Sequence, residues 1–187
     1  MDRVVEKELK FLNFLQSKMR TNKLDKIMVF ITSLGDWGFI WLALCLFMFF
    51  IPKFRNDSYT FALAIFLNAL ICNVILKPLC HRKRPFDLSK DIKLLVKSPT
   101  DYSFPSGHTT ASFTAAAVIF NISVTAGIIV VVLALLIGFS RMYLFLHFPS
   151  DVLVGGILGI IIAIIAINIM DNSVVQELKY IGESYIF

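Results

Sequence analysis

The sequence predicts an all-α protein, a polytopic bundle of five to six transmembrane helices with an amphipathic helix at the N-terminus. Of its 187 residues, 57% are hydrophobic and only 17% are charged, and the mean hydropathy is +0.76. A soluble domain carries about 25% charged residues. The hydrophobic residues also fall in long blocks. This composition excludes an ordinary soluble domain, a disordered chain and a disulfide scaffold, and no nucleic-acid partner is expected.

The first 26 residues are expected to form a helix that lies in the membrane interface. Val5, Leu9, Leu12 and Met19 form an apolar stripe, and polar residues line the opposite face. Amphipathic helices of this kind rest between the headgroups and the acyl chains. Because charges interrupt the apolar residues, the segment does not have the pattern of a signal peptide.

Apolar blocks then predict five membrane spans, at residues 37–51, 59–76, 107–122, 124–141 and 152–170. The first block extends back to residue 24, but Asp36 interrupts it, and an acidic residue is costly inside a membrane. We therefore interpret Asp36 as a helix breaker and predict a separate half-helix at residues 24–34. A sixth crossing by this half-helix gives the upper count of six, although about 11 residues are too few to span a bilayer alone.

The third and fourth spans are predicted to form a hairpin. Residues 109–140 carry no charge, and these 32 positions are too many for one span of about 20 residues. A short turn near Ser123 divides them. The hairpin returns His108 and Arg141 to the same membrane face, whereas a single span places them on opposite faces. No internal repeat is present, so residues 1–187 are predicted to form one domain.

Three polar segments interrupt the apolar blocks and converge on one membrane face in this topology. They are Lys77 to Arg84-Pro85, then Pro105-Ser106-Gly107-His108, then Ser140-Arg141 continuing to His147 and Asp151. Ionisable residues that converge at a membrane mark a functional site by default. The sequence therefore places a catalytic loop at residues 77–106.

The residue types suit a phosphate group. Arg84 and Arg141 offer planar forks for bidentate contact, and Lys77 adds a point charge. Ser106 and Gly107 lie at the start of the third span, where backbone N–H groups are unpaired and the helix dipole favours an anion. Gly107 has no Cβ, which allows close approach of the main chain.

The three segments carry the signature of the type 2 phosphatidic acid phosphatase superfamily, KX6RP, PSGH and SRX5HX3D, and the chain therefore resembles that family. All eleven specified positions are present in the right order and spacing between Lys77 and Asp151. The resemblance implies a membrane lipid phosphatase that works through a phosphohistidine. It assigns catalysis to His147, His108 and Asp151, and phosphate binding to Lys77, Arg84, Ser106, Gly107 and Arg141. Because the site already has three fixed cations, no metal or cofactor is expected.

Each catalytic role also has a chemical reason. A carboxylate beside one ring nitrogen fixes the histidine tautomer and leaves the other nitrogen free to attack, which suits His147 and Asp151. His108 is then the general acid for the leaving oxygen and the base for the attacking water. The remaining loop cations, Arg82 among them, are interpreted as attracting anionic headgroups.

The expected substrate is a lipid phosphate in the bilayer, with undecaprenyl diphosphate first, because residues 24–32 are similar to bacitracin-resistance relatives. Those relatives often carry Asp where Gly107 stands, so phosphatidylglycerol phosphate and phosphatidic acid remain alternatives. So do a lipid phosphotransferase and a non-enzymatic lipid-binding or transport protein. Protein partners are not indicated by the sequence.

The orientation of the site in the cell membrane has two opposing indications. With five spans, 15 of the 18 Lys and Arg residues lie on the side of the N-terminus and the site, and the positive-inside rule makes that side cytoplasmic. Several of those cations serve the phosphate, however, and the family resemblance favours an extracytoplasmic site. We therefore expect a multi-pass membrane protein with an extracytoplasmic site.

Overall fold

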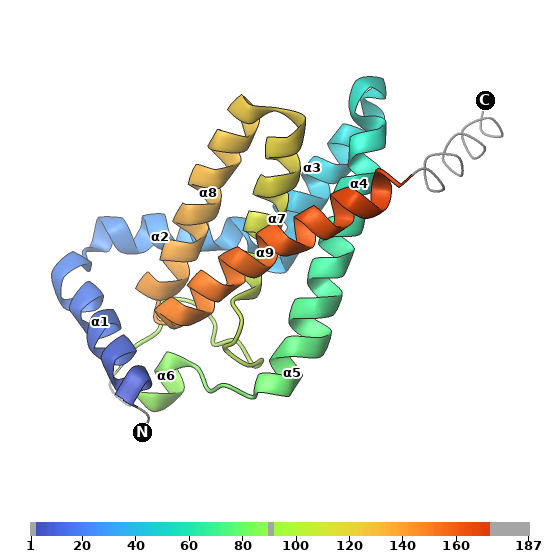
Figure 1. The fold of residues 1–187 in the computed structure, drawn as a ribbon. Coiled ribbons are helices and arrows are strands. Elements are labelled where there is room, and N and C mark those ends of the chain that lie inside the picture. Colours follow the sequence, from blue (N-terminus) through green and yellow to red (C-terminus); the bar gives the residue numbers. More distant parts are fainter. Residues whose placement is uncertain (1–2, 90–91, 173–187) are drawn as a thin grey trace.

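The computed structural model describes residues 3–89 and 92–172, and the regular elements in these ranges are all helices (Figure 1). Residues 1–2, 90–91 and 173–187 of the predicted domain lie outside the described residues. The main helices are α1 (Arg3–Met19), α2 (Asn22–Leu34), α3 (Phe39–Phe50), α4 (Arg55–Asn68), α5 (Lys77–Cys80), α6 (Pro85–Leu88), α7 (Gly107–Ile122), α8 (Val124–Tyr143) and α9 (Pro149–Met170).

The N-terminal segment differs from the single helix expected over residues 1–26. Helix α1 ends at Met19, and Thr21 caps a new helix by accepting a hydrogen bond from the Leu24 N–H at 3.2 Å. An N-cap threonine favours a helix start at this point. The predicted half-helix at 24–34 is therefore the main part of α2.

The apolar stripe of α1 packs against protein. Leu9 and Leu12 are buried with Phe145 and Phe148 of the α8–α9 loop. The opposite side of α1 still exposes large apolar side chains, such as Phe14. The interfacial position of α1 in a membrane thus stays a prediction, but its inner face is set by aromatic rings of the loop.

Three helical stretches of the described chain are long and apolar enough to cross a membrane: Pro52–Leu88, Val124–Tyr143 and Pro149–Met170. Helix α2 and the stretch Asp36–Phe50, which includes α3, pass the same test as a pair, with a bend of 41° between them. Helix α7, with 16 residues, is shorter. The structure thus supports three or four spans, and the count of five to six stays a prediction.

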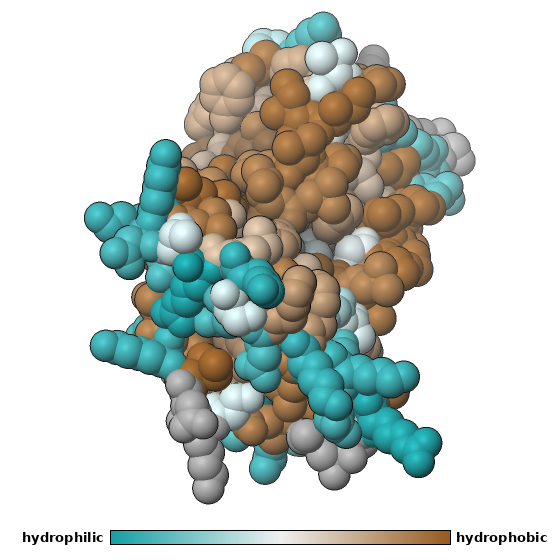
Figure 2. Space-filling view, turned by 90° about the vertical axis from the view of Figure 1, so that its left-hand side faces the viewer, coloured by the Kyte–Doolittle hydropathy of each residue, from teal (hydrophilic) through white to brown (hydrophobic). Residues whose placement is uncertain are grey.

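The surface of the protein is divided into a hydrophobic and a hydrophilic part, as expected of a membrane protein. Hydrophobic residues cover the upper part of the face in Figure 2, and hydrophilic residues gather on its lower part, the end at which Figure 1 shows α1. Exposed apolar side chains of this density are unusual for a water-facing surface. The apolar band therefore faces lipid.

Helix α7 forms the centre of the bundle and packs against α3, α4, α8 and α9 (Figure 1). It buries small side chains from Thr109 to Ala116, and α9 meets it with Gly155, Gly156 and Gly159. Small residues let helix backbones approach closely, which is how helices associate inside a membrane. This contact fixes the start of α7 beside the start of α9.

The predicted hairpin of residues 107–141 is confirmed. Helix α7 ends at Ile122, Ser123 caps α8, and the two helices pack along their length. A Cβ at Gly127 would collide with the backbone of Phe120, so the turn requires glycine at that close approach. His108 and Arg141 consequently lie at the same end of the bundle.

The α7–α9 packing predicts unequal effects of two neighbouring substitutions. A Cβ at Gly159 would collide with the Thr110 carbonyl oxygen, whereas a Cβ at Gly156 would lie 3.4 Å from the Phe113 ring, an ordinary contact. We expect Gly159→Ala to destabilise the protein by about 1–3 kcal/mol, as overpacking does, and Gly156→Ala to cost much less. Thermal unfolding in detergent measures both, and equal melting temperatures would contradict this packing.

Candidate active site

The three motif segments meet at one end of the bundle. Figure 1 shows the C-terminal end of α8 next to the start of α9, with α5, α6 and the loop of residues 92–106 at the same end. Lys77 is the first residue of α5 and directly follows a π-helical stretch, Ala69–Leu76. Short π-helical segments are frequent at functional sites.

His147 lies in the loop between α8 and α9 with only 1% of its surface exposed. Its Nε2 is 3.1 Å from Nη1 of Arg84. Because a guanidinium only donates hydrogen bonds, Nε2 is the acceptor and the ring proton resides on Nδ1. This tautomer leaves the lone pair of Nε2 on the side of the cations.

The Nδ1 atom of His147 faces Asp151 without a hydrogen bond. The distance from Nδ1 to Oδ2 of Asp151 is 3.6 Å, which is longer than a hydrogen bond, and Nδ1 has no other partner among the described residues. The expected pair is therefore adjacent but not engaged. Catalytic hydrogen bonds are often long before substrate binds and shorten in the complex.

Burial keeps His147 neutral. Desolvation lowers the pKa of this imidazole well below its ordinary value, and the positive charges of Arg84 and Arg141 lower the pKa further. A neutral imidazole at neutral pH has the free lone pair that a nucleophile requires.

Asp151 is fixed by three donors at the start of α9. Its carboxylate accepts from the Ser103 hydroxyl at 2.5 Å, the Phe148 N–H at 2.8 Å and Arg82 Nη1 at 2.5 Å. Arg82 in turn reaches Glu8 of α1 at 2.6 Å. The interpretation of Arg82 as a headgroup-attracting cation is thus wrong in this structure, because its guanidinium is enclosed between two carboxylates.

The cations Lys77 and Arg84 share one carboxylate, that of Asp101. Arg84 Nη2 donates to its Oδ1 at 2.6 Å, Arg84 Nε donates to its backbone carbonyl at 2.9 Å, and Lys77 forms an ion pair with Oδ2. Burial alone would raise the pKa of Asp101, but the two cations together lower it. Asp101 therefore sets the spacing of Lys77 and Arg84.

Arg141 contributes a buried guanidinium with an unused donor. Its Nη1 donates to the Thr32 hydroxyl of α2 at 2.7 Å, while Nε has no hydrogen-bond partner among the described residues. Buried polar groups are nearly always paired, so an orphan guanidinium N–H points to an anion as its partner. Arg141 is the clearest structural indication of a phosphate site.

In the PSGH segment, the backbone N–H of Ser106 is not free to bind phosphate as the sequence predicts. Its N–H donates to the Asp151 carbonyl at 3.1 Å and its hydroxyl bonds Thr109 at 2.8 Å, so the expected free N–H at Ser106 is wrong. Gly107 lies against the Lys77 ammonium, 3.4 Å from where its Cβ would be. Ser106 thus joins α7 to α9, and Gly107 allows Lys77 to approach.

Comparison with known proteins identifies the family of this chain. A family model described as the PAP2 superfamily matches residues 58–174, which include all three motifs. The chain belongs to the PAP2 superfamily. The family resemblance carried by the motifs is therefore confirmed.

Several relatives of this PAP2 chain are phosphatases by name. An undecaprenyl-diphosphatase of Sulfolobus acidocaldarius is 27% identical over 157 residues, which cover 83% of this chain and 75% of that protein. The crystal structure of Aquifex aeolicus LpxE superposes with a TM-score of 0.73 at 32% identity, covering 86% of this chain and 94% of that one. A transmembrane PAP2 type phosphatidylglycerolphosphate phosphatase from Bacillus subtilis gives 0.75 at 28% identity, covering 90% and 87%.

Sequence reasoning missed four residues of this PAP2 site: Asp36, Asp101, Ser103 and Glu8. Asp36 was interpreted only as a helix breaker, yet its Oδ1 lies 2.9 Å from Nε2 of His108. The motif fixes the histidines and cations but says nothing of their carboxylate partners. A carboxylate beside an otherwise apolar block was the available signal, and only for Asp36.

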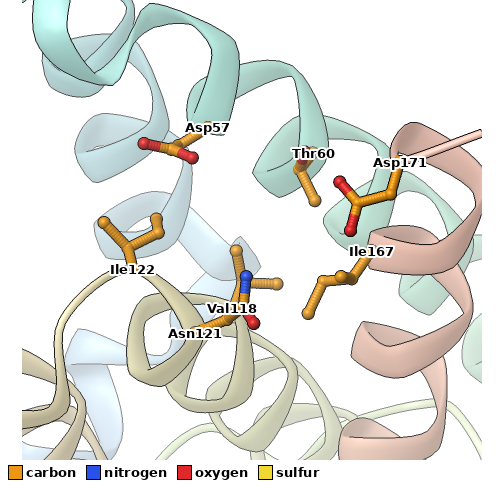
Figure 3. Close-up of a pocket in the computed structure, with 7 residues that line it drawn as sticks. All are labelled: Asp57, Thr60, Val118, Asn121, Ile122, Ile167 and Asp171. Carbon is orange, nitrogen blue, oxygen red and sulfur yellow. The ribbon is translucent and has the colours of Figure 1, made fainter. Parts of the chain in front are cut away.

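Other features do not extend the site. The described residues contain no cluster of three or more His, Cys, Asp or Glu side chains that could hold a metal ion. A pocket lies at the opposite end of α4, α7 and α9 (Figure 3) and contains no motif residue. It is lined by Asp57, Thr60, Val118, Asn121, Ile122, Ile167 and Asp171.

The buried neutral His147 predicts a pH-dependent stability. In the unfolded chain a histidine has a pKa of about 6.5 and takes up a proton below it, whereas the folded site resists protonation, so stability falls as the pH falls. Between pH 6.5 and 5.5, wild type should lose about 1 kcal/mol more stability than His147→Gln. Thermal unfolding in detergent at both pH values measures this, and the control His81→Gln, which removes an exposed histidine, should behave as wild type. Parallel curves for wild type and His147→Gln would contradict the buried neutral form.

Proposed function

We propose that this chain is a lipid phosphatase that removes the terminal phosphate of a lipid phosphate or diphosphate in the membrane, undecaprenyl diphosphate being the first candidate. The observation that carries the proposal is a buried neutral imidazole, His147, beside the guanidinium groups of Arg84 and Arg141, one of which keeps an unpaired N–H. A nucleophile next to preorganised cations is what phosphoryl transfer requires.

In the first half of the reaction, Nε2 of His147 attacks phosphorus while the bond to the leaving oxygen breaks. Arg84, Arg141 and Lys77 neutralise the charge on the remaining phosphate oxygens. The Nδ1–H of His147 approaches the Asp151 carboxylate as positive charge develops on the ring. His108 donates a proton to the leaving oxygen.

In the second half, water attacks the phosphohistidine. His108, now neutral, accepts the proton of that water, and His147 is released with inorganic phosphate as the product. The residues of the site supply the positive charge for both halves, so no step needs a metal ion. We therefore propose that the enzyme does not require a metal ion.

The choice of substrate rests on the relatives and is open between two classes. Similarity to an undecaprenyl-diphosphatase supports a lipid diphosphate, and similarity to a phosphatidylglycerolphosphate phosphatase supports a glycerophospholipid phosphate equally well. Gly107 in the PSGH motif favours the second class. A lipid phosphotransferase on the same scaffold would share the phosphohistidine and differ only in its acceptor.

The primary prediction concerns phosphate release by the detergent-purified protein in the presence of EDTA. Wild type should release phosphate, His147→Ala should be inactive because it lacks the nucleophile, and Asp151→Asn should retain a weak residual rate. The substrates are undecaprenyl diphosphate, phosphatidylglycerol phosphate and phosphatidic acid. Full activity in His147→Ala would refute the nucleophile assignment, and loss of wild-type activity in EDTA would refute metal independence. Phosphate appearing on an added lipid alcohol instead of in water would indicate a transferase.

An extracytoplasmic site predicts that one native cysteine is accessible to reagents from outside the cell. Cys80 is exposed at the end of α5, beside the site, whereas Cys72 is buried and Cys45 is half-buried. A membrane-impermeant maleimide should label intact cells at Cys80, and Cys80→Ser should abolish the labelling. Labelling only after the membrane is opened would place the site on the cytoplasmic face.

A further inference from the structure

We propose that Asp36 is a positioning residue for the acid–base chemistry of His108, forming with it a second carboxylate–histidine pair opposite Asp151 and His147. The inference rests on the proposed function and adds the residue that orients its proton donor. Asp36 is not one of the eleven motif positions, and it reaches His108 from a different membrane segment.

The contact between the two residues is direct and closely packed. Nε2 of His108 lies 2.9 Å from Oδ1 of Asp36, across 72 residues of sequence. The same imidazole rests against the end of α2, where a Cβ at Gly35 would come within 2.6 Å of its Cδ2 atom. Glycine at this position therefore lets the backbone at the end of α2 approach the ring closely.

The backbone turn that presents Asp36 is strained. Trp37 has a φ of 55° and Gly38 a φ of 69°, both in the left-handed region. This region is unfavourable for a bulky residue such as tryptophan. The Trp37 side chain is 88% exposed, so its own packing against the protein does not account for the strain. Strained backbone concentrates at functional sites, and here its effect is to aim Asp36 at His108.

The hydrogen bond determines which ring nitrogen does the chemistry. A carboxylate accepts the Nε2–H of His108, which leaves Nδ1 to exchange a proton with the reacting groups. The charged groups that act on this ring are Asp36, Arg141 and Lys77. Asp36 thus supplies negative charge to an imidazole that two cations also face.

The two halves of the reaction depend to different degrees on the Asp36–His108 pair. In the first half, the Nδ1–H bond breaks as the leaving oxygen takes the proton and its bond to phosphorus breaks. A leaving group that is stable as an anion does not need that proton. In the second half, Nδ1 takes a proton from water as the water oxygen bonds to phosphorus, and an imidazolium forms whose charge Asp36 offsets. Removing Asp36 should therefore slow the second half for every substrate.

The test is rapid mixing of the full-length purified protein with p-nitrophenyl phosphate, whose nitrophenolate leaves without a proton. The burst amplitude counts competent sites, and the later steady-state rate per site reports hydrolysis of the phosphohistidine. We expect Asp36→Asn to keep the burst and to lower the steady-state rate per site by about 10- to 100-fold, within the range that general acid–base catalysis contributes. His108→Asn should show the same pattern more strongly.

The matched control is Asp25→Asn, which removes the same charge from α2, the helix that precedes Asp36. Asp25 accepts from the Tyr143 hydroxyl and pairs with Arg20, away from His108. It should keep the wild-type rate per site. A second variant, Gly35→Ala, retains the carboxylate but crowds the ring, and it should lower the rate per site as Asp36→Asn does.

Two outcomes would overturn the proposal. One is a wild-type steady-state rate per site in Asp36→Asn. The other is a burst and steady-state rate that fall in proportion, since this indicates loss of folded sites rather than of acid–base positioning. A failure of the proposed function is distinct from both, because wild type would then show no burst that depends on His147.

Discussion

The guanidinium of Arg84 is the contact on which the site depends. It joins the loop after α5 to Asp101, to the Leu146 carbonyl at 2.8 Å and to the ring of His147. These partners come from two separate regions of the chain, so the cation fixes the catalytic loop against the α8–α9 connection. A planar fork with five donors makes such a junction possible, and a lysine would not replace it.

The Arg84 junction is stabilised by the close packing of helices α7 and α9 next to it. Glycines of α9 let the backbone of α7 approach, and the Ser106 N–H then bonds the Asp151 carbonyl between the two helix starts. In a membrane the association of helices depends on such close contact. The positions of His108 and Asp151 are thus set by residues that have no chemical role of their own.

Much of this arrangement was predictable from the sequence. The spacing of Lys77, Arg84, His108, His147 and Asp151 identified the family, and the uncharged run of 32 residues required the hairpin that unites them. The motif spacing is a local property of the sequence, and the hairpin follows from the length of helix that a membrane can accommodate.

The partners of those residues were not predictable from the sequence. Asp36, Asp101 and Glu8 act through contacts that only the folded chain creates. Asp36 interrupts an apolar block, but no local pattern distinguishes Asp101 or Glu8 from surface acids. The interruption of the N-terminal helix at Thr21 was missed because the apolar periodicity continues across it. Hydropathy also does not separate a lipid-facing helix from a central one such as α7, and for this reason the count of five to six spans stays a prediction.

The docking of α1 makes the N-terminal helix necessary for the arrangement of the catalytic site, although it carries no motif residue. Glu8 bonds Arg82 and the Ser150 N–H, and Arg82 bonds Asp151, so a chain of charges leads from the N-terminal helix to the catalytic carboxylate. A shortened protein that begins after α1 would retain every motif residue and every helix capable of crossing the membrane. It would nevertheless lose Glu8, one of the two carboxylates that pair with the Arg82 guanidinium, and leave Asp151 as the only counter-charge of the pair. Tags and fusions at this end of the protein therefore belong upstream of Arg3, with a linker that leaves α1 free to dock.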